Sequence, residues 1–226
     1  HEHDLVAAHD IPAERITWIP SEINTERFQP SVEDDSRRRT ILFTGAVCRN
    51  KGIDTLLSAC RILMTREVDF ELRLVGRILL WERAWFKAAC AQAELGSRLH
   101  MTGTLGYEAL LQEYQAAGVF AFPSRFEGSP RSVREALACR TSAVVSEIPG
   151  HRGIDPEGQF LHFVSGHDPQ DWADMLEVAM DESEASYDAR LDRGLSHMRN
   201  RHSLEAVAQV LAETYRDVSA RPPWSQ

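Results

Sequence analysis

The sequence has few cysteines and no long apolar run, and both absences narrow what the chain can be. Its four cysteines are scattered and form no CxxC pair, so neither a disulfide framework nor a cysteine zinc site is indicated. No apolar segment approaches the length of a membrane-spanning helix, and no signal-peptide pattern is visible. Cys60 and Cys139 fall on apolar helix faces, so reduced core thiols in a cytoplasmic protein are the simplest interpretation.

The chain also lacks an excess of positive charge, the common nucleotide-binding loops and a histidine cluster. Its formal net charge of −9 argues against a general surface that binds nucleic acid or an anionic membrane, although a local basic site for phosphate stays possible. Neither G-x-x-x-x-G-K-[ST] nor G-x-G-x-x-G occurs, so the P-loop and dinucleotide-binding interpretations lose their main support. The nine histidines show no metal-ligand spacing, and we expect neither a metal site nor a cofactor.

What the sequence does contain is an alternation of short apolar segments with amphipathic ones. Strands are predicted at 40–44, 71–75, 98–101, 119–122, 142–146 and 160–164, and helices at 53–64, 81–94, 107–117, 130–139, 169–180, 184–201 and 203–218. This alternation predicts an α/β, Rossmann-like, three-layer domain with a mainly parallel sheet and extra C-terminal helices. In such a sheet the ligand binds outside the carboxyl ends of the strands.

The most informative segment is Pro123–Ala138, PSRFEGSPRSVREALA, which follows a predicted strand. Ser129 is expected to be the N-cap of a helix whose first residue is Pro130. The first amides of that helix would be free to bind an anion such as phosphate. They belong to Arg131, Ser132 and Val133.

Two carboxylates flank this predicted anion site. Glu127 lies on the turn before the helix, and Glu135 lies on its second turn. Because carboxylate oxygens accept hydrogen bonds, both residues suit the hydroxyl groups of sugars. An anion site between two such residues indicates a site for a nucleotide sugar.

The chain resembles the C-terminal, donor-binding domain of retaining GT-B glycosyltransferases of family 4. The matching blocks, in order, are TGAVCRNKGIDTLL, ELRLVG, RLHMTGTL, VFAFPSRFEGSPRSVREALA, AVVSEIPGHRG and HSLEAVAQVLAETYRDV. The resemblance covers about 16–218, and ERITWIPSEINTERFQP is similar to the interdomain connection. It implies an interdomain segment and linker at 1–36, a nucleotide-sugar-binding domain at 37–180, and C-terminal helices at 181–226. Those helices would pack on the domain and towards an N-terminal acceptor-binding domain expected outside this chain.

The resemblance also implies roles for individual residues. Glu127 and Glu135 match the family's Glu-x7-Glu pattern, so that Glu127 would contact the sugar and Glu135 the ribose hydroxyls. The amides of Arg131 and Ser132 would bind the diphosphate. Lys51 matches the family's diphosphate-binding lysine and would act as a point charge without a metal. Glu127 and Lys51 are therefore the expected catalytic residues.

Other positions are expected to contact the donor with less direct support. The family's usual arginine after the first-loop glycine is missing, because Ala46 stands there, and Arg49 is the nearest substitute. Arg77 could contact the phosphate or the base, and Leu105 matches a position whose backbone contacts the base. The remaining expected donor-binding residues are Gly45, Gly128 and Val133.

The resemblance implies transfer of a hexosyl group from a nucleotide diphosphate sugar to a glycan or lipid-linked acceptor. The EGSPRS segment looks like that of relatives that assemble cell-surface polysaccharides, which implies a UDP-linked donor. The fragment alone is expected to have little activity. Its expected place is the cytoplasm, or the inner membrane face through the missing domain. Two alternatives remain: a non-catalytic nucleotide-sugar-binding subunit, which Ala46 favours, and a GT-B relative such as a nucleotide-sugar epimerase or a sugar-phosphate synthase.

An unusually apolar cluster lies within 78–86 and comprises Leu79, Leu80, Trp81, Trp85 and Phe86. Packing of a helix against the sheet is the simpler interpretation. The alternative is an exposed patch that serves a partner domain or a lipid-linked acceptor.

Overall fold

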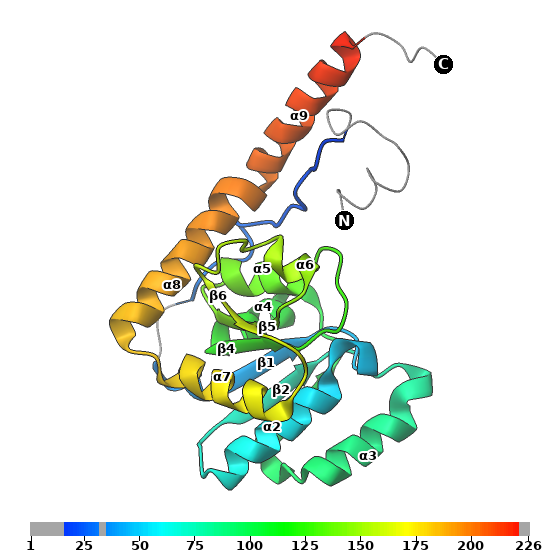
Figure 1. The fold of residues 1–226 in the computed structure, drawn as a ribbon, viewed down its shortest axis with the longest axis vertical. Helices are drawn as coiled ribbons and strands as arrows, with labels where there is room; N and C mark the ends of the chain where they lie inside the picture. Colours follow the sequence, from blue (N-terminus) through cyan, green and yellow to red (C-terminus); the bar gives the residue numbers. More distant parts are fainter. Residues whose placement is uncertain (1–15, 32–34, 222–226) are drawn as a thin grey trace.

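A six-stranded parallel sheet with the strand order β3-β2-β1-β4-β5-β6 forms the centre of the molecule (Figure 1). The computed structural model describes residues 16–31 and 35–221. The strands are β1 Thr40–Thr44, β2 Glu71–Val75, β3 Leu99–Gly103, β4 Val119–Phe122, β5 Ser142–Ser146 and β6 Leu161–Val164. The predicted Rossmann-like α/β fold is confirmed.

Helices cover both faces of this sheet. The α-helices of the described residues, not all of which pack on the sheet, are α2 Ile53–Thr65, α3 Arg83–Ala93, α4 Tyr107–Ala116, α5 Arg131–Ala138, α6 Pro149–Arg152, α7 Pro169–Asp181, α8 Glu184–His197 and α9 Leu204–Ala220. Helix α2 packs between α3 and α7 on one face, whereas α4 and α5 lie on the other (Figure 1). The sequence did not predict α6, because one helical turn is too short to show a 3.6-residue period.

Burial explains why some strands were easier to predict than others. Every residue of β4 and β5 is buried, since a central parallel strand has helices on both sides and reads as a continuous apolar run. Strand β3 lies at the sheet edge and is nowhere fully buried. Its predicted limits, 98–101, are correspondingly displaced from the observed ones.

The apolar cluster within 78–86 divides into buried and exposed parts. A 3-10 turn, η4 Leu80–Glu82, precedes α3, so the helix begins later than predicted. Phe86 is 3% exposed and packs in the core, as the simpler interpretation expected. That interpretation is wrong for Leu80 and Trp81, which are 71% and 78% exposed.

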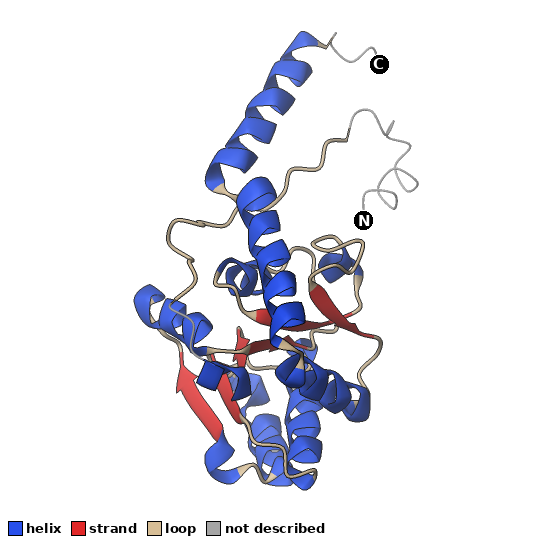
Figure 2. Cartoon of the chain, turned by 90° about the vertical axis from the view of Figure 1, so that its left-hand side faces the viewer, coloured by secondary structure: helices blue, strands red, loops and turns tan. Residues whose placement is uncertain are grey.

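The C-terminal helices are separated by a break that periodicity did not reveal. The helix predicted at 184–201 ends at His197 and continues as a π-helical turn, η6 Met198–His202. Ser203 then caps α9 by accepting a hydrogen bond from the Ala206 amide at 3.2 Å, and this predicted N-cap is confirmed. Helix α9 has no buried residue and projects beyond the sheet (Figure 2). Its packing towards a further domain stays a prediction.

The interdomain segment and linker expected at 1–36 ends inside a 3-10 helix, η2 Asp35–Arg39, while 1–15 and 32–34 lie outside the described residues. Arg38 donates to the Glu182 carbonyl at 2.7 Å, and Arg39 pairs with Asp181 at 2.7 Å. The basic side chains thereby fasten the entry to β1 onto the end of α7, a long-range contact that composition alone does not show.

Helix α8 is held on the sheet by Tyr187, whose hydroxyl donates to the buried Gly118 carbonyl at 3.0 Å. Replacing Tyr187 by phenylalanine leaves that carbonyl without its donor, so we expect the free energy of unfolding to fall by about 1–2 kcal/mol. Urea denaturation measures the change. Tyr215→Phe is the matched control, since Tyr215 is 65% exposed on α9. Equal effects of the two variants would contradict the role of this hydrogen bond.

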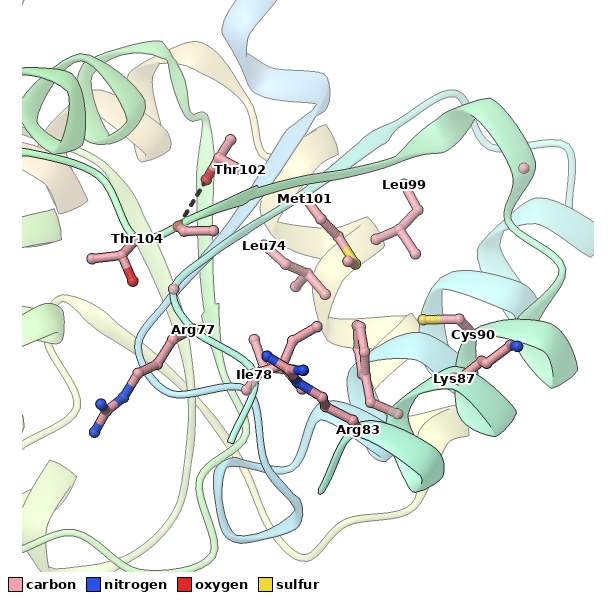
Figure 3. A pocket seen from close by; sticks show the side chains of 15 residues that line it. Leu74, Arg77, Ile78, Arg83, Lys87, Cys90, Leu99, Met101, Thr102 and Thr104 are labelled. Atoms are coloured by element: carbon pink, nitrogen blue, oxygen red, sulfur yellow. Dashed lines mark hydrogen bonds between the residues drawn. The ribbon is translucent and has the colours of Figure 1, made fainter. Parts of the chain in front are cut away.

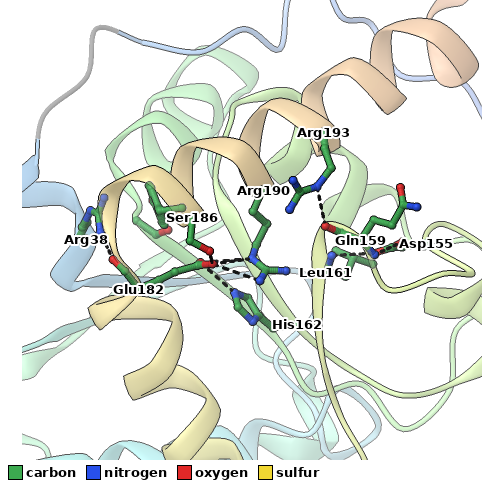
Figure 4. A network of polar contacts seen from close by, with 11 residues as sticks. Arg38, Asp155, Gln159, Leu161, His162, Glu182, Ser186, Arg190 and Arg193 are labelled. Carbon is green, nitrogen blue, oxygen red and sulfur yellow. Dashed lines mark hydrogen bonds and ion pairs between the residues drawn. The ribbon is translucent and has the colours of Figure 1, made fainter.

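Two histidines are buried where the last elements meet the sheet. His162 on β6 lies 3.6 Å from Glu182, which also binds Arg190 (Figure 4), and His202 contacts the Ser21 carbonyl through Nδ1 at 2.9 Å. Burial lowers the pKa of each histidine to about 4. Both side chains are therefore neutral in the folded protein at neutral pH.

This burial predicts a loss of stability in mild acid. An unfolded histidine takes up a proton near pH 6.5, whereas His162 and His202 resist protonation until about pH 4. The unfolded state binds more protons between these values, so the free energy of unfolding falls as the pH falls through this window. Urea titrations at several pH values measure the slope. His162→Gln and His202→Gln should each make it shallower, and an unchanged slope in both would contradict this account.

Candidate functional site

A pocket of about 420 Å³ lies where the loops after β1, β2, β3 and β4 meet the start of α5. This is the carboxyl end of the parallel sheet, as predicted. Of the residues expected from the sequence, the pocket brings together Gly45, Lys51, Leu105, Glu127, Arg131, Ser132 and Glu135. The structure thus joins residues from four separate loops into one cavity.

Lys51 is positioned by a short turn that only glycine can complete. It ends η3, Arg49–Lys51, and Gly52 follows with φ +67°. A Cβ atom at Gly52 would lie 2.0 Å from the Pro123 carbonyl oxygen, so the loop after β1 packs directly on the loop after β4. The Arg125 amide also donates to the Asn50 carbonyl at 2.9 Å. These contacts fix Lys51 against the turn that carries Glu127.

Glu127 is held from two sides inside the pocket. Lys51 Nζ and Ser124 Oγ both donate to Glu127 Oε1, the latter at 2.6 Å. Only 24% of the Lys51 side chain and 12% of the Glu127 side chain are exposed. Beneath them, a Cβ atom at Gly150 would lie 2.2 Å from the Glu127 carbonyl oxygen, so α6 supports this turn directly. The result is a preorganised, partly buried ion pair at the pocket wall.

Helix α5 begins one residue later than predicted. Pro130, with ψ 113°, is the N-cap, and Arg131 is the first helical residue. The expectation that Ser129 caps the helix is wrong, because its hydroxyl contacts Ser21 Oγ at 2.8 Å and accepts from Arg134. The Arg131 and Ser132 amides still lie in the first turn, where helical geometry provides no partner, and the N-cap residue Pro130 has no side-chain hydrogen bond to them.

Glu135 lies on the second turn of α5 and lines the same pocket as Glu127. Tyr114 Oη donates to Glu135 Oε2 at 2.8 Å and lies 2.6 Å from Thr44 Oγ1. Burial raises the pKa of Glu135, although the hydrogen bond from Tyr114 opposes this. Tyr114 is fully buried. Because it holds only one of the two oxygens of Glu135, the other can accept hydrogen bonds from a ligand.

Several expected donor-binding residues do not line the pocket. Arg49 lies 3.4 Å from Glu82 and stacks over Trp85 at 4.9 Å, on the α3 side of its loop. Ala46 lines the pocket. Arg49 therefore does not take the place of the arginine that relatives have at this position. Arg77 lines a separate, larger cavity.

Two further expected residues, Gly128 and Val133, do not line the pocket. The side chain of Val133 is fully buried in the core, because the helix turns this position towards the sheet. Only the backbone amide of Val133, in the first turn of α5, fits the expected role.

Sequence reasoning missed two residues that organise the site. Ser124 was visible in the PSRFEG segment, directly after a buried strand, but nothing in its spacing indicated a bond to Glu127. Tyr114 was predicted to face inwards from its helix, whereas its bond to Glu135 depends on how α4 and α5 pack.

The chemistry of the pocket follows from these placements. Lys51 and the first-turn amides of α5 offer positive charge and donors to an anion, while Glu127 and Glu135 offer acceptors in the same pocket. In the described part of the chain, no group of three or more His, Cys, Asp or Glu side chains is placed to hold a metal ion. Over the same residues, no helix is long and apolar enough to cross a membrane.

Curated relatives share this sequence at low identity. The chain is 28% identical over 240 residues to a D-inositol 3-phosphate glycosyltransferase of Xylanimonas cellulosilytica, covering 97% of this chain and 55% of that protein. It is also 28% identical over 236 residues to the protein of the same name from Corynebacterium urealyticum, again covering 97% and 55%. The chain thus spans about half the length of these relatives.

Solved structures share its fold. The Anabaena protein Alr3699/HepE in complex with UDP and glucose superposes with a TM-score of 0.81 at 16% identity, covering 97% of this chain and 61% of that one. A glycosyltransferase from Rickettsia africae superposes with a TM-score of 0.86 at 16% identity, covering 98% of this chain and 62% of that one. Sucrose-phosphate synthase from Thermosynechococcus elongatus superposes with a TM-score of 0.81 at 22% identity, covering 97% of this chain and 56% of that one.

The family assignment comes from a sequence model. The model described as "Glycosyl transferases group 1" matches residues 24–192. That span contains all six strands of the sheet, the pocket loops and both site glutamates. Because the match to the family model covers most of the chain, the chain belongs to the glycosyl transferases group 1 family.

Proposed function

We propose that this chain is the donor-binding part of a retaining, metal-independent glycosyltransferase of family 4 that takes a hexosyl group from a UDP-linked sugar. The pairing of Lys51 with Glu127 opposite the start of α5 carries this proposal. The presence of UDP in the Anabaena structure of the same fold supports the choice of nucleotide.

In the proposed mechanism, the donor diphosphate lies between Lys51 and the first amides of α5. Lys51 then exchanges Glu127 for phosphate oxygens, and Glu127 accepts hydrogen bonds from the sugar hydroxyls. As the bond to the anomeric carbon breaks, negative charge grows on the leaving diphosphate, which the lysine and the helix start stabilise. Glu135, held by Tyr114, binds the ribose hydroxyls and fixes the donor orientation.

We further propose that the acceptor is a glycan or a lipid-linked glycan, bound largely by a separate N-terminal domain. The curated relatives are named for D-inositol 3-phosphate, which makes a polyol phosphate the other acceptor to test. The chain covers about 55% of those proteins, so acceptor groups outside it are expected.

Ala46 favours a second candidate, a nucleotide-sugar-binding subunit without catalysis. Arg49 does not supply the missing side chain, because it is directed towards Glu82 and Trp85. Such a subunit would bind the donor through Lys51 and Glu135 but would not promote departure of the diphosphate.

Calorimetry with UDP, ADP and GDP in the presence of EDTA tests donor binding. We expect UDP to bind most tightly and its affinity to be unchanged by the chelator. Failure of all three nucleotides to bind would overturn both candidates. The protein joined to its acceptor domain is then tested with UDP-glucose. If it binds UDP but neither hydrolyses UDP-glucose nor transfers glucose from it, the result favours the non-catalytic subunit.

A further inference from the structure

Five exposed residues, three cationic and two apolar, lie close together in the chain within 77–87, at the loop after β2 and the start of α3. We call this group the α3 patch and define it by Arg77, Leu80, Trp81, Arg83 and Lys87. Leu80 and Trp81 stand next to one another, 71% and 78% exposed. They are the most exposed large hydrophobic side chains among the described residues, and nothing in the fold explains their exposure.

The cations of the α3 patch are unpaired. Among residues 16–31 and 35–221, no ion pair or hydrogen bond holds the side chain of Arg77, Arg83 or Lys87. The one acidic residue between 77 and 87, Glu82, is 8% exposed and pairs with Arg49 instead. A local excess of positive charge therefore stands on a chain whose net charge is −9.

An apolar cavity of about 920 Å³ opens beside these cations, between α3 and the edge strand β3. Its walls include Leu74, Ile78, Phe86, Leu99 and Met101, with Cys90 lining it from α3 (Figure 3). Arg77, Arg83 and Lys87 line the same cavity. Arg83 and Ile78 both line this cavity (Figure 3), so charged and apolar groups share its wall.

We propose that the α3 patch binds the surface of a bilayer that contains anionic phospholipid. Trp81 and Leu80 enter the interfacial region, where an indole ring and an aliphatic side chain are both accommodated. Arg77, Arg83 and Lys87 contact lipid phosphates, while the apolar cavity accepts one acyl chain. The unpaired cations favour an anionic bilayer over a purely apolar partner surface, because an apolar surface would remove water from the cations without supplying negative charge.

The α3 patch and the pocket are contiguous, since Gly76 and Thr104 line both cavities. Binding of the patch to a bilayer would hold the pocket at the membrane surface. This inference goes beyond the proposed function and does not depend on it, because no patch cation lines the nucleotide pocket.

Co-sedimentation of the 226-residue chain with vesicles tests the inference. We expect binding to vesicles of mixed phosphatidylglycerol and phosphatidylcholine, none to phosphatidylcholine alone, and weaker binding in high salt. Each cation is expected to raise the affinity for anionic vesicles about fivefold. The triple variant Arg77→Gln/Arg83→Gln/Lys87→Gln should therefore weaken vesicle binding about 100-fold. The matched control is Arg199→Gln/Arg216→Gln, at basic residues outside the patch, which should bind like the parent chain.

The apolar part of the α3 patch has its own variants. Leu80→Ser/Trp81→Ser should weaken binding at least tenfold, whereas Val178→Ser, at a residue 55% exposed on α7, should not. Circular dichroism and thermal melting establish that each variant is folded. Cys90→Phe narrows the cavity, and unchanged vesicle binding by this variant would overturn the acyl-chain contact.

Three results would overturn the proposal as a whole. The first is no binding of the parent chain to anionic vesicles. The second is an equal loss in the patch and control variants. The third is self-association that Leu80→Ser/Trp81→Ser abolishes, seen by sedimentation velocity without lipid, which would assign the α3 patch to a second copy of the chain.

Discussion

Replacing Lys51 by alanine is expected to weaken UDP binding by about 10- to 150-fold (~1.5–3 kcal/mol), the range of a hydrogen bond to a charged group. Two effects add in this variant. The diphosphate loses its point charge, and Glu127, whose side chain is only 12% exposed, loses its cation. Its negative charge then faces the incoming phosphates without compensation.

The choice of ligand separates a phosphate contact from a general loss of structure. Lys51→Ala should weaken UDP while leaving uridine nearly unchanged, because the nucleoside carries no phosphate. Lys87→Ala is the matched control, since these are the two lysines of the chain and Lys87 lies outside the pocket. Calorimetry with both ligands measures the difference, and equal losses for UDP and uridine would contradict the role of Lys51.

Replacing Glu135 by alanine is expected to weaken UDP and uridine alike, by about 10- to 150-fold (~1.5–3 kcal/mol). The expected partner of this carboxylate is the ribose, which both ligands contain. The different selectivity of the two variants therefore separates the phosphate contact of Lys51 from the ribose contact of Glu135. Calorimetry showing unchanged uridine affinity in Glu135→Ala would remove this residue from the ribose site.

Glu135→Gln gives a sharper test, because affinity and stability should move in opposite directions. Burial raises the pKa of Glu135, so the folded state disfavours its charged form. A neutral glutamine keeps an oxygen for the Tyr114 hydroxyl and removes that penalty, so the melting temperature at neutral pH should rise while UDP binding weakens. A lower melting temperature would show that the carboxylate serves the fold rather than the ligand.

The same raised pKa sets the pH dependence of binding. Hydroxyl groups donate better to a carboxylate than to its protonated form, so affinity for uridine should fall as acid protonates Glu135. This loss should begin at a higher pH than an ordinary glutamate would give. In Glu135→Gln the acid-dependent part of uridine binding should disappear, which calorimetry at several pH values can measure.

Local sequence determined the strands and most of the helices. Buried strand β4 is apolar at every position and β5 is apolar between its terminal serines, and long amphipathic helices repeat with a period that can be read directly. Short turns escaped prediction, as η4 and α6 show, because a single turn has no period. The position of Leu80 and Trp81 was misjudged for a related reason: hydrophobicity does not state whether a neighbouring element covers a residue.

The sequence by itself determined that Lys51, Glu127 and Glu135 lie after strands whose carboxyl ends share one edge, since parallel pairing places those ends together. Only the tertiary structure decided that Lys51 pairs with Glu127, that Tyr114 holds Glu135, and that Arg49 is directed towards Glu82. These contacts join residues from different loops and helices, and their geometry depends on close approaches such as Gly52 on Pro123 and Gly150 on Glu127. Packing between separate elements leaves no local pattern, so no reading of one segment could reveal it.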